Sequence, residues 1–236
     1  MLESLKNKKI LIIVAHPDDE LLGVGGTMNK LANEYNCTIR SVILGEGITS
    51  RASYRDPELW KLELIEHKKN IESARKAIGY TSVGVYDFPD NRFDSVDLLD
   101  IVKIVETEKK EFNPEIIFTH HGGDLNIDHQ KTFEAVITAI RPMEHEKVKM
   151  IITFETPSGT EWRAASDPKH FIPNFFIEIS KKNLQAKIKG MESYKFEKRD
   201  YPHPRSSEAL TILAKQRGII VGKLLAEAFM IIRVIS

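Results

Sequence analysis

Short runs of apolar, mostly β-branched residues recur along the first 155 positions, and longer amphipathic stretches separate them. Several runs are apolar at nearly every position, whereas a strand with one solvated face alternates apolar and polar side chains. Unbroken apolar runs are typical of parallel strands that helices cover on both faces. The pattern predicts five strands, over 9–15, 38–45, 82–88, 115–120 and 148–155.

The stretches between these runs carry apolar residues at helical spacing, in a stripe after the first run and in a looser stripe before the third. Spacings of three and four place such side chains on one helix face. Alternating strands and helices predict an α/β fold, namely a Rossmann-like, doubly wound and mostly parallel sheet with helices on both faces. The two stripes consist of Leu21, Val24, Met28, Leu31 and Tyr35, and of Leu62, Ile65, Ile71, Ala74 and Ile78.

The regular alternation stops after the fifth predicted strand. Residues 156–174 are rich in Pro, Ser and Gly, which predicts a long functional loop and not a linker between domains. We therefore expect a single domain over 1–236, whose C-terminal half extends the sheet or caps its mouth. Beyond the loop the pattern predicts a strand over 175–180, helices from about Lys181 and Ser206, and a final apolar run over 229–235.

Charge and cysteine content narrow the class of function. The chain has 34 basic and 34 acidic residues, so no overall field gathers nucleic acid or an anionic membrane. Cys37 is the only cysteine, which excludes an intrachain disulfide and fits a reducing compartment. No stretch approaches the ~18 consecutive apolar residues of a membrane span, and the first residues lack the apolar core of a signal peptide. We expect a cytoplasmic protein with a small-molecule partner, no nucleic acid and no membrane span.

The segment AHPDDE, residues 15–20, places a histidine and three acids directly after the first predicted strand. Acids in the first turn of a helix are ordinary, because free N–H groups and the positive end of the helix dipole favour carboxylates there. A helix start explains one or two of the three acids, Glu20 among them as a helix cap, but it does not explain His16. Once the chain turns helical after the proline, His16 and Asp19 can converge on one cation while Asp18 projects beside them. The segment therefore indicates a divalent metal site with a spare carboxylate for proton transfer.

A second group of histidines and acids, in THHGGDLNIDHQ, follows the fourth predicted strand. A single histidine there would more often be a hydrogen-bonded polar residue than a metal ligand. Because ligands bind beyond the carboxyl ends of parallel strands, we expect this group to meet AHPDDE at one edge of the sheet. Nitrogen and carboxylate donors suit Zn²⁺, and they also suit Fe²⁺. The polar residues of the second group are His120, His121, Asp124, Asp128 and His129.

The glycines of GVGG, residues 23–26, superficially match the phosphate-binding fingerprint of dinucleotide folds. That fingerprint needs its first glycine in the turn right after the strand. Here the turn holds His-Pro-Asp-Asp, whose charge would repel a pyrophosphate. We expect the glycines to let the helix lie close to the sheet. The sequence contains no nucleophile elbow, P-loop or H-E-x-x-H helix.

Taken together, these motifs resemble the LmbE-like, or PIG-L-type, zinc-dependent N-deacetylases. The resemblance rests on AHPDDE after the first strand and DLNIDH after the fourth, with GEG, FPDNRF, PSGTEW, PNFF and YPHPRSSEAL along the rest of the chain. It implies a Zn²⁺ ion held by His16, Asp19 and His129, with Asp18 as the general base. It also implies hydrolysis of an N-acetyl group, mostly on N-acetylglucosamine units that are free or conjugated.

The chain departs from parts of this family at two places. Some members have a catalytic histidine three residues before the last metal ligand, and this chain has Asn126 there. An amide is no general acid, although it can donate a hydrogen bond to the substrate or to the oxyanion. We expect His203, between two prolines, to take the missing role, with Asp128 as its orienting partner. Many relatives also carry an arginine and a glutamate near His67 and Asn70, so the substrate contacts of that arginine are not carried over.

Further residues are expected around this site. An indole stacks on a sugar face and guanidinium groups bind phosphate oxygens, although each such residue can equally brace a loop. The candidate contacts of this kind are Trp162, Arg163, Arg92 and Arg205. His120, His121 and Asp124 are expected behind the ligands or in the wall of the site. His67, His145 and His170 are expected on the surface.

Two other classes of function stay open at this point. A Rossmann-type nucleotide or cofactor binder would use the acids on a ribose, although the turn after the first strand repels phosphate. A zinc-binding protein without catalysis would use Asp18 only to cap the helix. A homo-oligomer also stays open, because the apolar run 229–235 fits an interface strand as well as a core strand.

Overall fold

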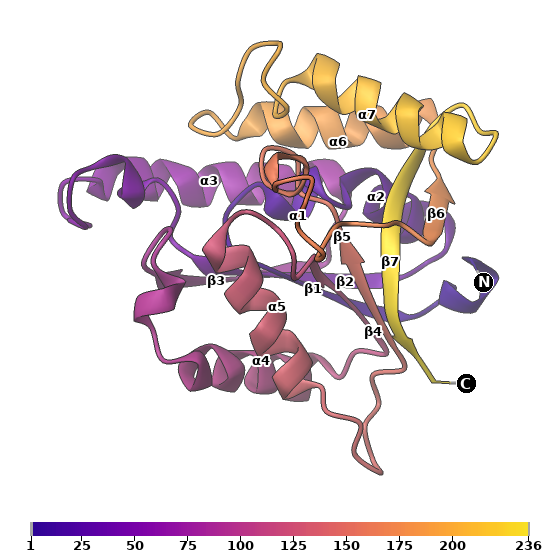
Figure 1. Ribbon diagram of the computed structural model, residues 1–236, viewed down its shortest axis with the longest axis horizontal. Coiled ribbons are helices and arrows are strands. Elements are labelled where there is room, and N and C mark those ends of the chain that lie inside the picture. The colour runs from indigo at the N-terminus through magenta and orange to yellow at the C-terminus, as the bar shows by residue number, and fades with distance from the viewer. Residues whose placement is uncertain (1, 236) are drawn as a thin grey trace.

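A seven-stranded sheet forms the centre of the molecule in the computed structural model, which describes residues 2–235 (Figure 1). The strand order is β3-β2-β1-β4-β5-β7-β6. Strands β1 to β5 are parallel, and β7 is antiparallel to both of its neighbours. This confirms the predicted Rossmann-like, mostly parallel α/β fold. The strands are β1 Lys9–Val14, β2 Thr38–Gly45, β3 Ser82–Phe88, β4 Ile116–His120, β5 Met150–Phe154, β6 Phe175–Glu178 and β7 Ala226–Val234.

Helices cover both faces of the sheet (Figure 1). Helices α2 and α3 pack on one face, and α4 and α5 pack on the other. Helix α6 lies over α2 and α3, and α7 packs against α6 and β7. The helices are α1 Asp19–Leu22, α2 Gly25–Glu34, α3 Lys61–Ile78, α4 Leu98–Phe112, α5 Ile127–Ala139, α6 Lys181–Ser193 and α7 Ser207–Ile220.

The central strand β1 shows why the apolar runs do not alternate. Ile10, Ile12 and Val14 are fully buried on the side of α2 and α3. Leu11 and Ile13 are fully buried on the side of α4 and α5. Since both faces lie under helices, every position from Ile10 to Val14 is apolar, and only Lys9 at the exposed start of the strand is charged.

The first predicted helix is divided into two, α1 and α2, at Gly23 and Val24. The division occurs where the chain crosses close to β5. A Cβ atom on Gly23 would lie 2.0 Å from Cδ2 of Phe154, so any larger residue would be driven into that ring. The expectation of a close approach to the sheet is confirmed for Gly23 and for Gly26, which lies against Glu227 of β7, whereas Gly25 faces Lys187 of α6.

Helix α3 is rotated relative to its predicted stripe. Leu62 and Ile65 are exposed, whereas His67, expected on the surface, is only 2% exposed. The surface prediction for His67 is wrong because a histidine at helical spacing within an apolar stripe takes the burial of that stripe. The side of α3 that faces the core runs through Leu64, His67, Ile71, Ala74 and Ile78.

The C-terminal half both extends the sheet and covers it. The run predicted over 229–235 belongs to β7, which lies inside the sheet between β5 and β6. Of this run only Phe229 is buried and pairs with both neighbours, whereas Ile232 and Val234 are exposed, so the run is a strand of the sheet and a role as an interface stays open. Helices α6 and α7 form a cap, so the C-terminal half fulfils both of the roles that were expected as alternatives. Among residues 2–235, no helix is long and apolar enough to cross a membrane.

The carboxylate of Glu227, which is buried in an ion pair with Lys187, joins the C-terminal half to the start of α2. Glu227 in β7 accepts hydrogen bonds from the N–H groups of Gly26 (3.1 Å) and Thr27 (2.7 Å), where the first turn of a helix has free donors. Lys187 of α6 donates to the same carboxylate at 2.6 Å. Glu227 and Lys187 are both almost fully buried. The carboxylate therefore caps a helix and neutralises a buried cation at once.

We expect Glu227→Ala to lower the free energy of unfolding by about 3–5 kcal/mol, because it leaves the Lys187 ammonium buried without a partner. Equilibrium urea unfolding measures this loss. Glu178→Ala is the control, since its pair with Lys223 is half exposed and its loss should cost at most about 1 kcal/mol. Equal losses in the two variants would contradict the role of the Glu227 pair.

Candidate active site and metal centre

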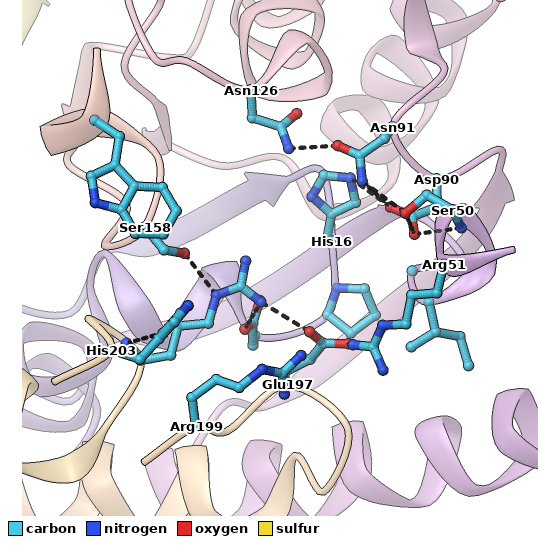
Figure 2. Close-up of a pocket in the computed structure, with 16 residues that line it drawn as sticks. His16, Ser50, Arg51, Asp90, Asn91, Asn126, Ser158, Glu197, Arg199 and His203 are labelled. Carbon is cyan, nitrogen blue, oxygen red and sulfur yellow. Dashed lines mark hydrogen bonds and ion pairs between the residues drawn. The ribbon is translucent and has the colours of Figure 1, made fainter. Parts of the chain in front are cut away.

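A cavity of about 250 Å³ lies at the carboxyl ends of the parallel strands. Each of the loops after β1, β2, β3, β4 and β5 contributes to its lining, and the loop between α6 and α7 closes one side. Figure 2 shows Asn91 and Asn126 on one side of the cavity and Glu197 and Arg199 on the opposite side. The site therefore draws on both halves of the chain.

Three side chains converge beside this cavity around one carboxylate oxygen. Oδ2 of Asp19 lies 3.3 Å from Nδ1 of His16 and 3.2 Å from Nε2 of His129. His16 follows β1, Asp19 begins α1, and His129 lies in the first turn of α5. The ligand atoms offered by these residues all lie within 4.8 Å of one another. Two imidazole nitrogens and one carboxylate oxygen form a donor set that fits a divalent cation.

Each of the two histidines also faces a carboxylate with its other ring nitrogen. Nε2 of His16 lies 2.9 Å from Oδ2 of Asp128, and Nδ1 of His129 lies 3.1 Å from Oδ1 of Asp124. Such a carboxylate holds the proton on the outer nitrogen and leaves the inner nitrogen free to bind a metal. The surroundings of both histidines therefore match those of metal ligands.

The charges in this cluster are strongly coupled. Burial lowers the pKa of His129, but Asp19 and Asp124 outweigh this effect and raise it to about 9. Burial opposes ionisation of Asp19, yet His129 and His120 hold the pKa of Asp19 well below its usual value. Asp19 therefore stays negative, and a bound cation would take over the compensation that a proton on His129 provides.

A neutral histidine, His120, packs behind the ligands. Its Nε2 accepts the N–H of Ala15 at 3.0 Å, and its ring stacks on that of His129 with 3.9 Å between centroids. Burial and the neighbouring His129 lower the pKa of His120 to about 4. His120 and Asp124 thus lie where they were expected. His121 instead bonds the backbone oxygen of Lys169 and braces the long loop.

Asp18 lies at the cavity with one oxygen engaged and one free. Nη1 of Arg205 donates to its Oδ2 at 3.1 Å. Its Oδ1 is buried and has no hydrogen-bond partner among residues 2–235. Burial raises the pKa of Asp18 well above its usual value, and the charge of Arg205 opposes that rise. An unpaired carboxylate oxygen of raised basicity is suited to accept a proton.

Backbone strain gathers at the same cavity. Four lining residues other than glycine have positive φ: Asp18 (103°), Ile48 (56°), Asn91 (54°) and Ser158 (71°). Elsewhere in the described chain only asparagines do so, and asparagine tolerates this region best. Strained residues persist where the surrounding structure enforces them, which is typical of functional sites.

Four of the predicted contact residues line the cavity, and two do not. Arg92 is exposed and lies outside the lining, and Arg163 pairs with Asp167. The residues at the cavity are Asn126, Trp162, His203 and Arg205. Asn126 is also the N-cap of α5, where its Oδ1 accepts the N–H of Asp128 at 2.8 Å.

The expected pairing of Asp128 with His203 is corrected by the structure. Asp128 binds His16, and its oxygens also accept two backbone N–H groups from the loop after β3. Its acceptor sites are used beside the metal ligands, so Asp128 orients His16. Nδ1 of His203 instead accepts the N–H of Arg205 at 3.1 Å, and its ring meets the edge of Trp162.

Several lining residues were not singled out from the sequence. Ser50 and Arg51 follow β2, and Asp90 and Asn91 follow β3, so their place after parallel strands was a usable signal. Oδ1 of Asp90 also lies 3.4 Å from Nε2 of His16. Two more, Glu197 and Arg199, lie between α6 and α7, where no strand end points to the site.

Comparisons with known proteins agree with this geometry. The PIG-L family model, described as GlcNAc-PI de-N-acetylase, matches residues 11–140, which hold both metal-ligand motifs. The chain belongs to the PIG-L family. It is therefore a deacetylase, that is, an amide hydrolase of this family. The model does not extend to the loop between α6 and α7, so the family match says nothing of His203 or Arg205.

Individual relatives match most of the chain. It is 26% identical over 195 residues to the uncharacterized deacetylase YaiS of Escherichia coli, covering 80% of this chain and 92% of YaiS. It is 24% identical to the probable N-acetyl-alpha-D-glucosaminyl L-malate deacetylase 2 of Bacillus anthracis, covering 94% and 88%. The N,N'-diacetylchitobiose deacetylase of Pyrococcus horikoshii has a similar fold, with TM-score 0.70, 18% identity and coverage of 96% and 84%.

A second possible group of ligand atoms shares His16, through Nε2, with Asp90 and Asp128. Substitution of one carboxylate from each group distinguishes the two candidate metal sites. We expect Asp19→Asn to weaken metal binding by more than the ~10–100-fold that loss of an outer partner costs, because it removes a ligand. Asp90→Asn should retain the metal. Metal content after dialysis, with circular dichroism as a check on folding, measures both, and the reverse result would place the ion at the other group.

Proposed function

We propose that the protein uses Zn²⁺ to hydrolyse the N-acetyl group of an N-acetylglucosamine-type sugar or sugar conjugate. The observation that carries this proposal is the free Oδ1 of Asp18 at a cavity beside the donors His16, Asp19 and His129. The family description and the names of the relatives support an N-acetylated sugar as the substrate class.

The donor set fits the zinc that the family implies. Two imidazole nitrogens and one carboxylate oxygen are a usual set for catalytic zinc, which keeps a further position open. When bound there, zinc supplies a Lewis acid that polarises the amide carbonyl and lowers the pKa of water to roughly 7.

The residues of the chain then have distinct tasks. Asp18 accepts a proton from the attacking water at its free oxygen, while Arg205 holds the other oxygen in place. The C–N bond of the amide breaks as acetate forms, and the sugar amine needs a proton to leave. Asp18 holds the proton taken from water and returns it to the nitrogen.

His203 is better suited to donate a hydrogen bond than to carry a full proton. Burial, Arg205 and Arg199 lower its pKa, so the ring is neutral near pH 7. Because its Nδ1 accepts the N–H of Arg205, the proton of the neutral ring lies on Nε2. A neutral N–H donor at the cavity can stabilise the developing oxyanion. This revises the role of general acid that the sequence suggested.

We expect Asp18→Asn to lower the release of acetate from N-acetylglucosamine derivatives by about 10²–10⁴-fold with zinc retained, because the amide cannot accept the proton. An assay across a panel of free, lipid-linked and nucleotide-linked N-acetyl sugars measures this. Full activity in the variant would contradict the role of Asp18. If the native protein retains zinc but releases no acetate, a zinc-binding protein without catalysis would be favoured. If nucleotides raise its melting temperature, a nucleotide binder would be favoured.

We expect His203→Ala to lower kcat by about 10²-fold, the usual cost of losing one oxyanion donor. His203→Gln should recover part of this loss, because its amide still offers an N–H donor. The control is His170→Ala, since His170 is exposed and lies outside the cavity lining. A kcat unchanged in His203→Ala would remove His203 from the reaction.

A further inference from the structure

The third acid of the AHPDDE segment, Glu20, has a connection that the metal site and the base do not explain. It is only 2% exposed. Its Oε2 accepts the N–H of Asp18 at 3.0 Å, and its Oε1 accepts the hydroxyl of Tyr194 at 2.5 Å. The sequence suggested a helix cap, but the side chain reaches back to the residue before the helix, and its second oxygen is held from α6.

Asp18 needs such support because its backbone is strained. Its φ of 103° lies where residues other than glycine are rare and strained. This conformation separates two adjacent carboxylates, so that Asp19 meets the histidines while Asp18 meets Arg205. A hydrogen bond to the N–H of Asp18 stabilises the strained peptide directly.

Tyr194 connects this point to the C-terminal layer. It is the C-cap residue that follows α6, lies 174 positions after Glu20, and is fully buried in the main core. Its ring also meets the ring of His67 edge to face, at 5.9 Å between centroids. Packing thus fixes the ring, and the hydroxyl in turn fixes the Glu20 carboxylate.

We propose that Tyr194 is a positioning residue for catalysis, which acts through Glu20 to hold Asp18 in the orientation that accepts the proton. This proposal rests on the proposed function of Asp18 as the base. The segment that ends α6 then does more than cover the sheet, because the hydroxyl of Tyr194 sets the geometry of the AHPDDE segment after β1.

The chain offers a matched control in Tyr80. This residue is as buried as Tyr194 and also donates its hydroxyl to Glu20, but to the backbone oxygen, at 2.6 Å. Tyr80→Phe and Tyr194→Phe therefore remove the same group from the same neighbour. Only Tyr194→Phe releases the carboxylate that holds Asp18.

The experiment compares kcat, KM, zinc content and thermal stability of both variants with the native protein in the acetate-release assay. We expect Tyr194→Phe to lower kcat about tenfold, with KM and zinc content within twofold of native. Tyr80→Phe should keep kcat within twofold, although both variants lose similar stability. Equal kcat in the two variants would overturn the proposal. Lack of acetate release by the native protein would instead overturn the proposed function.

Crystal structures of the two variants test the positioning without a substrate. In Tyr194→Phe we expect the Glu20 carboxylate to turn and Asp18 to leave its hydrogen bond with Arg205, which spans 3.1 Å in the native protein. In Tyr80→Phe both should stay in place. An unmoved Asp18 in Tyr194→Phe would contradict the proposal whatever the substrate is.

Discussion

The site depends on one buried carboxylate, that of Asp19, which needs positive charge around it. A buried anion is costly unless it is paired, and Asp19 lies within 3.4 Å of ring nitrogens from His16, His120 and His129. Of these, His120 already uses the facing nitrogen to accept a backbone N–H. The remaining two nitrogens are free to share a cation with Asp19. A divalent ion at this point would take over the compensation that a proton on His129 otherwise provides.

The rest of the architecture serves to hold this arrangement. Parallel strands bring the two motifs to one edge, and Asp124 and Asp128 orient the rings of the two histidines. The C-terminal half then contributes the remaining wall of the cavity. Arg205 restrains the Asp18 carboxylate, and the loop that carries Arg205 closes the cavity opposite the strand ends. The separate orientations of the neighbouring acids Asp18 and Asp19 thus depend on a contact between segments almost 190 positions apart.

The parts of this structure that sequence can predict are those set by local pattern. The runs over 38–45 and 82–88 match β2 and β3 to the residue. Burial imposes apolar side chains on most of β2, whereas β3 is an edge strand without a fully buried residue, and its β-branched and aromatic residues mark it instead. The meeting of the two motifs follows from strand direction alone. The positions of residues that depend on tertiary packing could not be predicted from the sequence. His67 is buried by the rotation of α3, and Glu197 reaches the cavity from a loop with no strand before it. The tie between Glu20 and Tyr194 likewise has no signal in either segment.

The most direct test of the account is an anomalous difference map, recorded at the zinc absorption edge from crystals grown with one equivalent of zinc. The account predicts a single peak about 2.0–2.2 Å from Nδ1 of His16, a carboxylate oxygen of Asp19 and Nε2 of His129. A peak against Nε2 of His16 and the carboxylate of Asp90, or no peak at this edge of the sheet, would contradict it.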